Sequence, residues 1–159
     1  MRIIVFSDTH GNFSAMHKIF KRNNSADCFV FLGDGLDELE DIKAIYPDKK
    51  ILSVSGNCDF GALRPSADVA LIGGMRVFYT HGHRYDVRYS TAKLKAKAKE
   101  LGAKIVLFGH THCRHYEYTG QGVYILNPGS AALPRDGLAA SYAFIDITPN
   151  GIMCAHVDL

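Results

Sequence analysis

The feature that most constrains the fold of this chain is an alternation of short apolar runs with helical patterns over its first third. Apolar runs occupy residues 2–7, 28–33 and 50–56, and each has the length and composition of a strand that is covered on both faces. Between them, residues 13–23 and 36–46 place apolar side chains along one face of a helix. This order predicts a parallel sheet with right-handed crossovers.

The ends of two predicted helices carry residues that suit helix termini. Asn12 can cap the first helix, and Lys21 and Arg22 fall near its C-terminal end, where cations are favoured. A lysine-rich helix is predicted over 91–102, with Gly102 as its C-terminal cap.

The second half of the chain predicts antiparallel pairing. Two strand-like runs, 69–72 and 76–82, flank Gly73-Gly74, a pair that is typical of a hairpin turn. A further strand is expected at 104–110, and a meander of four strands follows at residues 115–120, 123–129, 141–148 and 152–159. We therefore predict an α/β fold in which two mixed sheets pack face to face, with the helices outside.

The length and charge of the chain limit its class. With 159 residues, 47% of them hydrophobic, the chain fits a single domain spanning residues 1–159. A formal net charge of +2 is too small to attract nucleic acid or a membrane through a long-range field. No apolar run has the length of a signal-peptide core or a membrane span, so we expect a soluble, cytoplasmic protein. The four cysteines lie far apart and form no CxxC, which predicts free thiols.

Polar side chains gather at the ends of five predicted strands. They are Asp8 and His10, Asp34, Asn57 and Asp59, His81 and His83, and His110 and His112. Ligands of open α/β sheets bind beyond the carboxyl ends of the strands, so these side chains can converge although they are scattered along the sequence. Glycines beside several of them, such as Gly33 and Gly109, permit sharp turns and close backbone approach.

The mixture of side chains at these strand ends is typical of a metal site. Imidazoles, carboxylates and an amide oxygen without thiolates suit Mn, Fe, Zn, Co or Ni ions better than a structural zinc held by cysteines. Four imidazoles, two carboxylates and one amide oxygen from this set make seven candidate ligands, which are too many for one tetrahedral ion but suffice for two ions that share a carboxylate.

Five motifs carry a resemblance to a known family. DTH (8–10), GD (33–34), GNCD (56–59), HGH (81–83) and GHTH (109–112) resemble, in order, the motifs of the calcineurin-like metallophosphoesterases. The short chain is similar to the compact, YfcE-type phosphodiesterase branch of that superfamily, and the resemblance extends from residue 2 to about residue 147. It implies a four-layer αββα sandwich with a binuclear metal centre at one edge.

The resemblance also implies the role of each ligand. Asp8, His10 and His112 would hold the first metal, Asn57, His81 and His110 the second, and Asp34 would bridge the two. It implies a phosphodiesterase that cleaves a small or nucleotide-like phosphodiester by attack of a hydroxide bridging the metals. We expect Mn²⁺ as the metal, with Ni²⁺, Fe²⁺, Co²⁺ or Zn²⁺ as alternatives, and a homodimer on the resemblance alone.

One residue departs from the family pattern. Cys58 stands where many relatives have a histidine that is taken to protonate the leaving group. A neutral thiol is a poor substitute for imidazolium, which favours diesters over monoesters as substrates. His83 or Asp59 can supply part of the missing function. Two alternatives to the phosphodiesterase stay open: a phosphomonoester or phosphoprotein phosphatase, and a protein-interaction scaffold of the same fold.

Four further residues carry weaker predictions. Asn12 and Cys58 are candidates for substrate contact, although Cys58 can equally be a small buried residue. Asn127 is predicted either to face the substrate or to hold the ligating imidazoles. His115 is the third histidine of the run 109–115, and we expect it to lie outside the ligand set.

Overall fold

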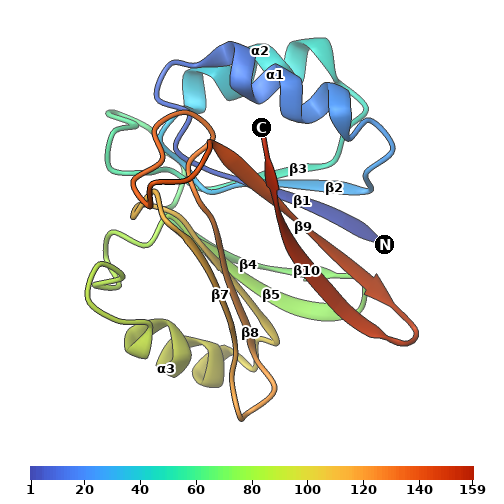
Figure 1. Ribbon diagram of the computed structural model, residues 1–159, viewed down its shortest axis with the longest axis vertical. Helices are drawn as coiled ribbons and strands as arrows, with labels where there is room; N and C mark the ends of the chain where they lie inside the picture. Colours follow the sequence, from blue (N-terminus) through green and yellow to red (C-terminus); the bar gives the residue numbers. More distant parts are fainter.

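The computed structural model describes residues 1–159 as two five-stranded sheets with three helices (Figure 1). The first sheet has the strand order β10-β9-β1-β2-β3. Its strands are β1 (Arg2–Phe6), β2 (Cys28–Phe31), β3 (Ile51–Ser53), β9 (Ser141–Thr148) and β10 (Gly151–Asp158). β1, β2 and β3 are parallel, as the alternating pattern predicts, while β9 pairs antiparallel with both β1 and β10.

The second sheet has the strand order β4-β5-β6-β8-β7. Its strands are β4 (Ala67–Ile72), β5 (Met75–Thr80), β6 (Ile105–Phe108), β7 (Arg114–Tyr118) and β8 (Tyr124–Pro128). The predicted hairpin is confirmed, because Ile72 pairs with Met75 across Gly73-Gly74 and both glycines have positive φ. Parallel pairing of β5 with β6 and of β6 with β8 makes this sheet mixed, as the first one is.

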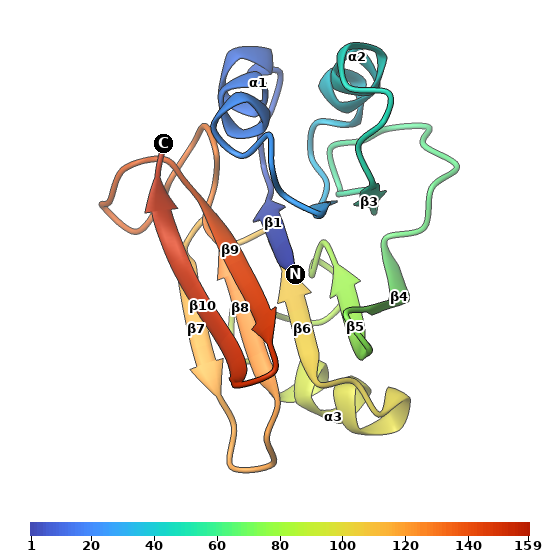
Figure 2. The same cartoon turned by 90° about the vertical axis from the view of Figure 1, so that its right-hand side faces the viewer.

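Helices cover the outer faces of both sheets. α1 (Phe13–Arg22) and α2 (Leu36–Ile45) lie on the first sheet and α3 (Ala92–Leu101) on the second, at opposite ends of the molecule in Figure 2. Two helix caps predicted from the sequence are present in the structure. Asn12 caps α1 by accepting from the backbone N–H of Ala15, and Gly102 ends α3 in the left-handed conformation. Each helix spans ten residues, and none combines the length and apolarity that a membrane crossing needs.

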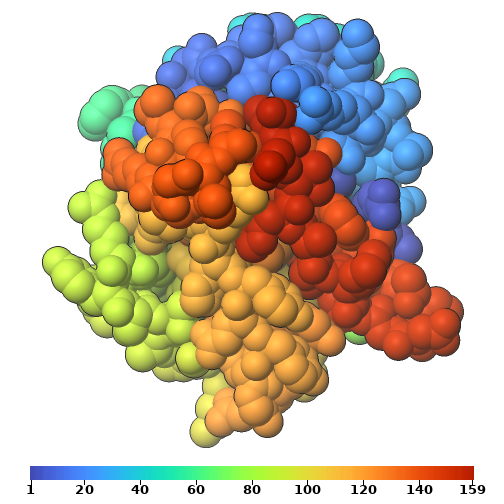
Figure 3. Space-filling view, viewed as in Figure 1, coloured from blue at the N-terminus to red at the C-terminus, as the bar shows by residue number.

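Alternation along the strands divides the core into layers. In β1, Ile3 and Val5 point into the core between the sheets, whereas Ile4 and Phe6 pack beneath α1 and α2. On the other side, α3 packs its buried Leu94 against the outward-facing residues of the second sheet. The result is the predicted four-layer αββα sandwich, and the space-filling view shows the C-terminal strands lying against the N-terminal helices (Figure 3).

One strand is shorter than predicted. The apolar run 50–56 forms a strand only at Ile51–Ser53. Beyond it, the backbone N–H of Ser55 donates to Pro65 O and its hydroxyl to Arg64 O, so the chain pairs with its own loop. Because β3 is the edge strand of the first sheet, the loop that follows it, residues 54–66, lies at the edge of that sheet. This loop carries Asn57 and Asp59 and contributes them to the candidate site.

Candidate metal centre

The predicted ligands are presented by turns in an unusual backbone conformation. Six residues other than glycine have positive φ, and five of these are predicted ligands: Asp8 (57°), His10 (45°), Asp34 (61°), His110 (69°) and His112 (59°). Left-handed conformations are strained for side chains of this size and persist only where the surroundings enforce them. The clustering of this strain at the strand ends supports a functional site there.

Close contacts between loops fix these turns in place. The backbone N–H of Asp8 donates to Gly33 O, and that of His10 donates to Asp34 O, so the loops after β1 and β2 are joined. A Cβ added at Gly33 would overlap the backbone of Gly56, and one added at Gly109 would overlap Ser7 Oγ. The glycines predicted to permit close approach at these ends are therefore required by the packing.

Three predicted ligands form a first group of converging atoms. Asp8 Oδ1 lies 3.3 Å from His112 Nε2 and 3.8 Å from His10 Nε2, and the two Nε2 atoms are 3.2 Å apart. These three residues can hold one cation. They are the set that the resemblance assigns to the first metal.

Asp34 connects this group to a second one. Its Oδ2 lies 3.8 Å from His10 Nε2 and 3.5 Å from His81 Nε2. His81 Nε2 in turn lies 3.1 Å from Asn57 Oδ1. The carboxylate of Asp34 thus stands between the two predicted metal positions, where a bridging ligand would be needed.

The tautomers of two histidines follow from their outer partners. His81 Nδ1 lies 2.8 Å from Leu32 O and His112 Nδ1 lies 2.7 Å from Leu133 O. A carbonyl oxygen only accepts, so each Nδ1 carries the proton and each Nε2 presents a lone pair to the centre. The sequence contains no side-chain pattern that marks these two carbonyl groups, and they were missed for that reason.

The donor set fits a bound cation. Asp8 Oδ1 is buried and accepts no hydrogen bond, which is costly for a carboxylate. The lone pair of His81 Nε2 faces the oxygens of Asn57 and Asp34, so acceptors face acceptors with no proton between them. Cations of the borderline to hard divalent class satisfy such a mixture of nitrogen and oxygen atoms.

Protonation states at the centre favour ligand binding. Burial acts to raise the pKa of Asp8, but the neighbouring imidazoles of His112 and His81 bring it below its ordinary value. Burial, with the charge of His81 next, lowers the pKa of His110 to about 4. Near neutral pH the centre therefore offers an ionised carboxylate and a neutral imidazole.

His110 lies slightly apart from the other candidates. Its backbone N–H donates to Asp8 Oδ2 at 3.1 Å, and its ring centroid is 5.2 Å from that of His81. Its place on the His81 side agrees with the second metal position. His115, the third histidine of the run 109–115, contacts Phe108 and Glu117 and not the candidate ligands. This agrees with the expectation that it lies outside the ligand set.

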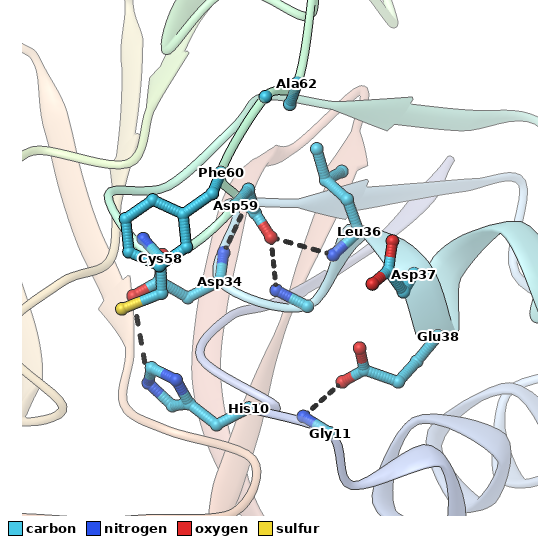
Figure 4. A pocket seen from close by; sticks show the side chains of 12 residues that line it. His10, Gly11, Asp34, Leu36, Asp37, Glu38, Cys58, Asp59, Phe60 and Ala62 are labelled. Atoms are coloured by element: carbon cyan, nitrogen blue, oxygen red, sulfur yellow. Dashed lines mark hydrogen bonds and ion pairs between the residues drawn. The ribbon is translucent and has the colours of Figure 1, made fainter.

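Asp59 requires a correction. Its Oδ2 accepts from the backbone N–H groups of Asp34 and Gly56, and its Oδ1 accepts from those of Gly35 and Leu36. Figure 4 shows the side chain of Asp59 turned toward the loop of Asp34 and Leu36. Burial opposes ionisation, but these four donors lower its pKa below the ordinary value. The carboxylate is thus committed to holding the loop of Asp34 and is a positioning residue rather than the catalytic support that was predicted.

Asn127 also holds a loop instead of facing the substrate. Its side chain is fully buried, and Nδ2 donates to Gly109 O at 2.9 Å and to Thr111 Oγ1 at 3.0 Å. A side chain without exposed surface has no access to a substrate, so that alternative does not fit. The residue supports the turn that carries His110 and His112, and contacts neither imidazole.

The remaining predicted residues take distinct positions. Cys58 is exposed beside His10 and Asp34, which favours the pocket alternative over the buried one. His83 lies on the other side, 5.3 Å from the ring of His81, and burial lowers its pKa. The Asn12 side chain is engaged in capping α1, so its contact with a substrate stays a prediction.

A residue that the sequence analysis missed also supports the first loop. Glu38 Oε1 accepts from the backbone N–H of Gly11 at 2.6 Å and from Thr9 Oγ1 at 3.0 Å. Acidic residues are common in the first turn of a helix, because their negative charge interacts favourably with the positive end of the helix dipole. The sequence alone therefore does not reveal this contact.

Comparison with known proteins identifies the family. The model of the calcineurin-like phosphoesterase superfamily domain matches residues 1–150. The chain belongs to this superfamily. The probable metallophosphoesterase YsnB of Bacillus subtilis is 31% identical over 148 residues, which cover 92% of this chain and 85% of that protein. Phosphodiesterase YfcE of Escherichia coli is 27% identical over 172 residues, covering 92% and 88%. Membership supports a metal-dependent phosphoesterase.

Solved structures agree on the fold. A predicted phosphoesterase from Streptococcus pneumoniae superposes with a TM-score of 0.79 at 28% identity, covering 98% of this chain and 97% of that one. Vps29 of Entamoeba histolytica, solved with Zn²⁺, has a TM-score of 0.75 at 21% identity and covers 99% of each chain. The second likeness concerns the fold alone, because one fold can serve unrelated functions.

Proposed function

We propose that this member of the superfamily is a phosphodiesterase that binds two divalent ions and hydrolyses a small phosphodiester. The observation that carries the proposal is the convergence of imidazole nitrogens on the carboxylates of Asp34 and Asp8, where Asp8 Oδ1 is buried without a hydrogen-bond partner. Asp8, His10 and His112 would hold one ion and Asn57, His81 and His110 the other, with Asp34 shared. Mn²⁺ suits this mixture, as do Ni²⁺, Fe²⁺, Co²⁺ and Zn²⁺.

Bound ions would supply Lewis acidity, an activated water and neutralisation of charge on the phosphoryl oxygens. The residues of the chain keep the ligands oriented for that task. The backbone N–H of Cys58 donates to Asp34 Oδ1 at 2.7 Å, which leaves Oδ2 directed at the histidines. The carbonyl groups of Leu32 and Leu133 hold two imidazoles in one tautomer.

Preference for a diester follows from the chemistry of Cys58. Partial loss of solvent around the thiol, with hydrogen bonding to Asp34 next, raises the pKa of Cys58 to about 11, so it is neutral at physiological pH. It cannot provide the cationic acid that assists departure of a poor leaving group. His83, which lines a cavity together with Asn57 and His110 on the other side of the centre, stays a candidate for part of that role. A diester with a good leaving group needs less of this help.

The scaffold alternative rests on the likeness to Vps29. The seven candidate ligands are all present here, and five of them lie in strained turns, which are typical of functional sites. We therefore favour catalysis. The homodimer and the cytoplasmic location stay predictions.

A hydrolysis assay tests the proposal. Metal-stripped protein is mixed with bis(p-nitrophenyl) phosphate or p-nitrophenyl phosphate, and Mn²⁺, Ni²⁺, Zn²⁺ or Mg²⁺ is added back. We expect metal-dependent cleavage with a higher kcat/KM for the diester, and its loss in Asp34→Asn. Asp41→Asn, which changes an exposed carboxylate on α2, is the matched control. Absence of hydrolysis with every metal, or full activity of Asp34→Asn, would falsify the proposal.

A further inference from the structure

Resting on the proposed phosphodiesterase activity, we propose that one arm of the substrate is a neutral aromatic group that stacks on Phe60. Three features of the surface around the candidate metal centre point to such an arm: a cavity that begins at the ligands, an exposed aromatic ring in its wall, and a difference in charge between the two sides of the centre.

The cavity opens directly from the candidate ligands. It has a volume of about 530 Å³, and His10 and Asp34 form part of its wall. Phe60, Gly61 and Ala62, from the loop after β3, also line it. Figure 4 shows Phe60 and His10 on different sides of this cavity. A group attached to a phosphorus atom at the metal centre would therefore extend toward Phe60.

Phe60 contributes almost nothing to the folded core, because its side chain is 91% exposed. Single exposed apolar residues are ordinary on protein surfaces. Leu63 on the same loop is such a residue, since it is fully exposed and lies outside the cavity wall. Phe60 differs from it by standing in the wall of a cavity that holds two candidate ligands. An aromatic ring at such a place offers a flat surface for stacking.

The charge of this cavity excludes an anionic arm. Asp37 and Glu38 line it, and Asp37 is exposed with no cation paired to it. A second phosphate or a carboxylate on the substrate would be repelled by these side chains. Hydroxyl and amino groups, in contrast, can donate hydrogen bonds to them. The cavity therefore suits an uncharged ring that carries donors.

The opposite side of the centre has the complementary charge. A second cavity, of about 330 Å³, is lined by Arg88 together with Asn57 and His110. Asp86 also lines it but is paired with Lys93, which leaves the guanidinium of Arg88 as the uncompensated charge. An anionic arm, or the free phosphoryl oxygens, would go to this side. The two cavities together assign the neutral aromatic arm to Phe60.

Inhibition by paired phosphonates tests this inference on the full chain loaded with Mn²⁺. Phenylphosphonate and methylphosphonate share the metal-binding group and differ only in the arm. We expect the phenyl compound to inhibit hydrolysis of bis(p-nitrophenyl) phosphate about tenfold more strongly. Phe60→Ala should bring the ratio of the two inhibition constants close to one. Leu63→Ala, the matched control, should keep both the ratio and the hydrolysis rate.

A charged probe tests the second part. 4-Carboxyphenylphosphonate should bind more weakly than phenylphosphonate to the wild type, and Asp37→Asn should reduce that difference. If Phe60→Ala keeps the wild-type ratio while hydrolysis proceeds, the inference is wrong and the proposed function stands. If nothing is hydrolysed, the proposed function fails, and the same ratios are measured as ligand-dependent thermal stabilisation of the Mn²⁺-loaded protein, which needs no turnover.

Discussion

His10 Nε2 and His112 Nε2 lie 3.2 Å apart, although the two residues are separated by 102 positions in the chain. Because His112 Nδ1 carries the proton that is donated to Leu133 O, its Nε2 faces His10 with a lone pair. Asp8 Oδ1 approaches the same point and has no hydrogen-bond donor. A cation at this point would satisfy all three atoms.

Metal binding should therefore stabilise the fold measurably. At a metal concentration of about 100 times Kd, linkage gives about 2.7 kcal/mol, which for a chain of this size raises Tm by roughly 5–10 °C. His112→Gln should remove more than half of this shift in a thermal melt with and without Mn²⁺. His115→Gln, three residues along the same run, should keep it. An equal loss in both variants would contradict the ligand assignment of His112.

Much of the fold could be predicted from the sequence, because local patterns determine it. The alternating runs marked the three parallel strands of the first sheet, and Gly73-Gly74 marked the hairpin. The strand predicted at 50–56 was too long, since an apolar run does not reveal that Ser55 will pair with Pro65 in its own loop. Whether an apolar segment finds a neighbouring strand depends on tertiary contacts.

The candidate ligands were also visible in the sequence, but their supports were not. Asp and His after a strand are distinctive, whereas the carbonyl of Leu133 has no side-chain signature. The role of Asp59 in the structure differs from the predicted one for a related reason. A carboxylate near a site looks the same in sequence whether it meets a substrate or four backbone N–H groups.

Asp59→Asn should lower both stability and metal affinity. The amide of this variant would keep one oxygen as an acceptor, but its NH₂ group would face two of the backbone N–H groups that now donate to the carboxylate. Those backbone N–H groups would lose their acceptor. We expect a loss on the order of 2–4 kcal/mol in the free energy of unfolding, measured by urea denaturation of the metal-free protein. Asp41→Asn should change it by less than about 0.5 kcal/mol. A wild-type unfolding curve for Asp59→Asn would show that the four bonds do not support the loop.

Cys58→His should shift the balance of activities toward monoesters. An imidazole at this position can carry the positive charge and proton that the thiol lacks, and general acid catalysis of this kind contributes about 10²-fold or more. We expect kcat for p-nitrophenyl phosphate to rise by about 10-fold or more relative to the diester. Cys58→Ser, which adds no titrating group, should leave the ratio of the two activities near the wild-type value. An equal rise in Cys58→Ser would show that the gain in monoesterase activity does not come from acid catalysis by the imidazole.

His156 should contribute to the pH dependence of stability. Burial lowers its pKa in the fold, while the unfolded chain takes up the proton near pH 6.5. Below that pH the unfolded state therefore binds more protons at His156 than the folded state does. The contribution of neutral, buried His156 to the free energy of unfolding is full above about pH 6.5 and is lost as the pH falls toward the folded pKa. His156→Gln should reduce the loss of unfolding free energy between pH 7.5 and 5.0, in metal-free protein followed by urea denaturation. An unchanged pH dependence would rule out this contribution.

Gly109→Ala tests whether close packing of the loops sets the metal centre. A Cβ at this position would overlap Ser7 Oγ, and Ser7 is fully buried beside Asp8, so the turn must move. Overpacking of this kind costs roughly 1–3 kcal/mol. Since the backbone N–H of His110 donates to Asp8 Oδ2, the same movement should shift His110 away from Asp8 and weaken metal binding.

Gly120 is the matched control for this substitution, because a Cβ there meets no atom within 4 Å and its φ is not positive. Gly120→Ala should leave the metal-dependent rise in Tm unchanged, whereas Gly109→Ala should reduce it together with the unfolding free energy. If Gly109→Ala lowers stability but keeps the full metal-dependent rise, then the contact of Ser7 with Gly109 serves the fold alone. In that case the strained turns at Asp8 and His110 are set by their own hydrogen bonds rather than by the approach of the two loops.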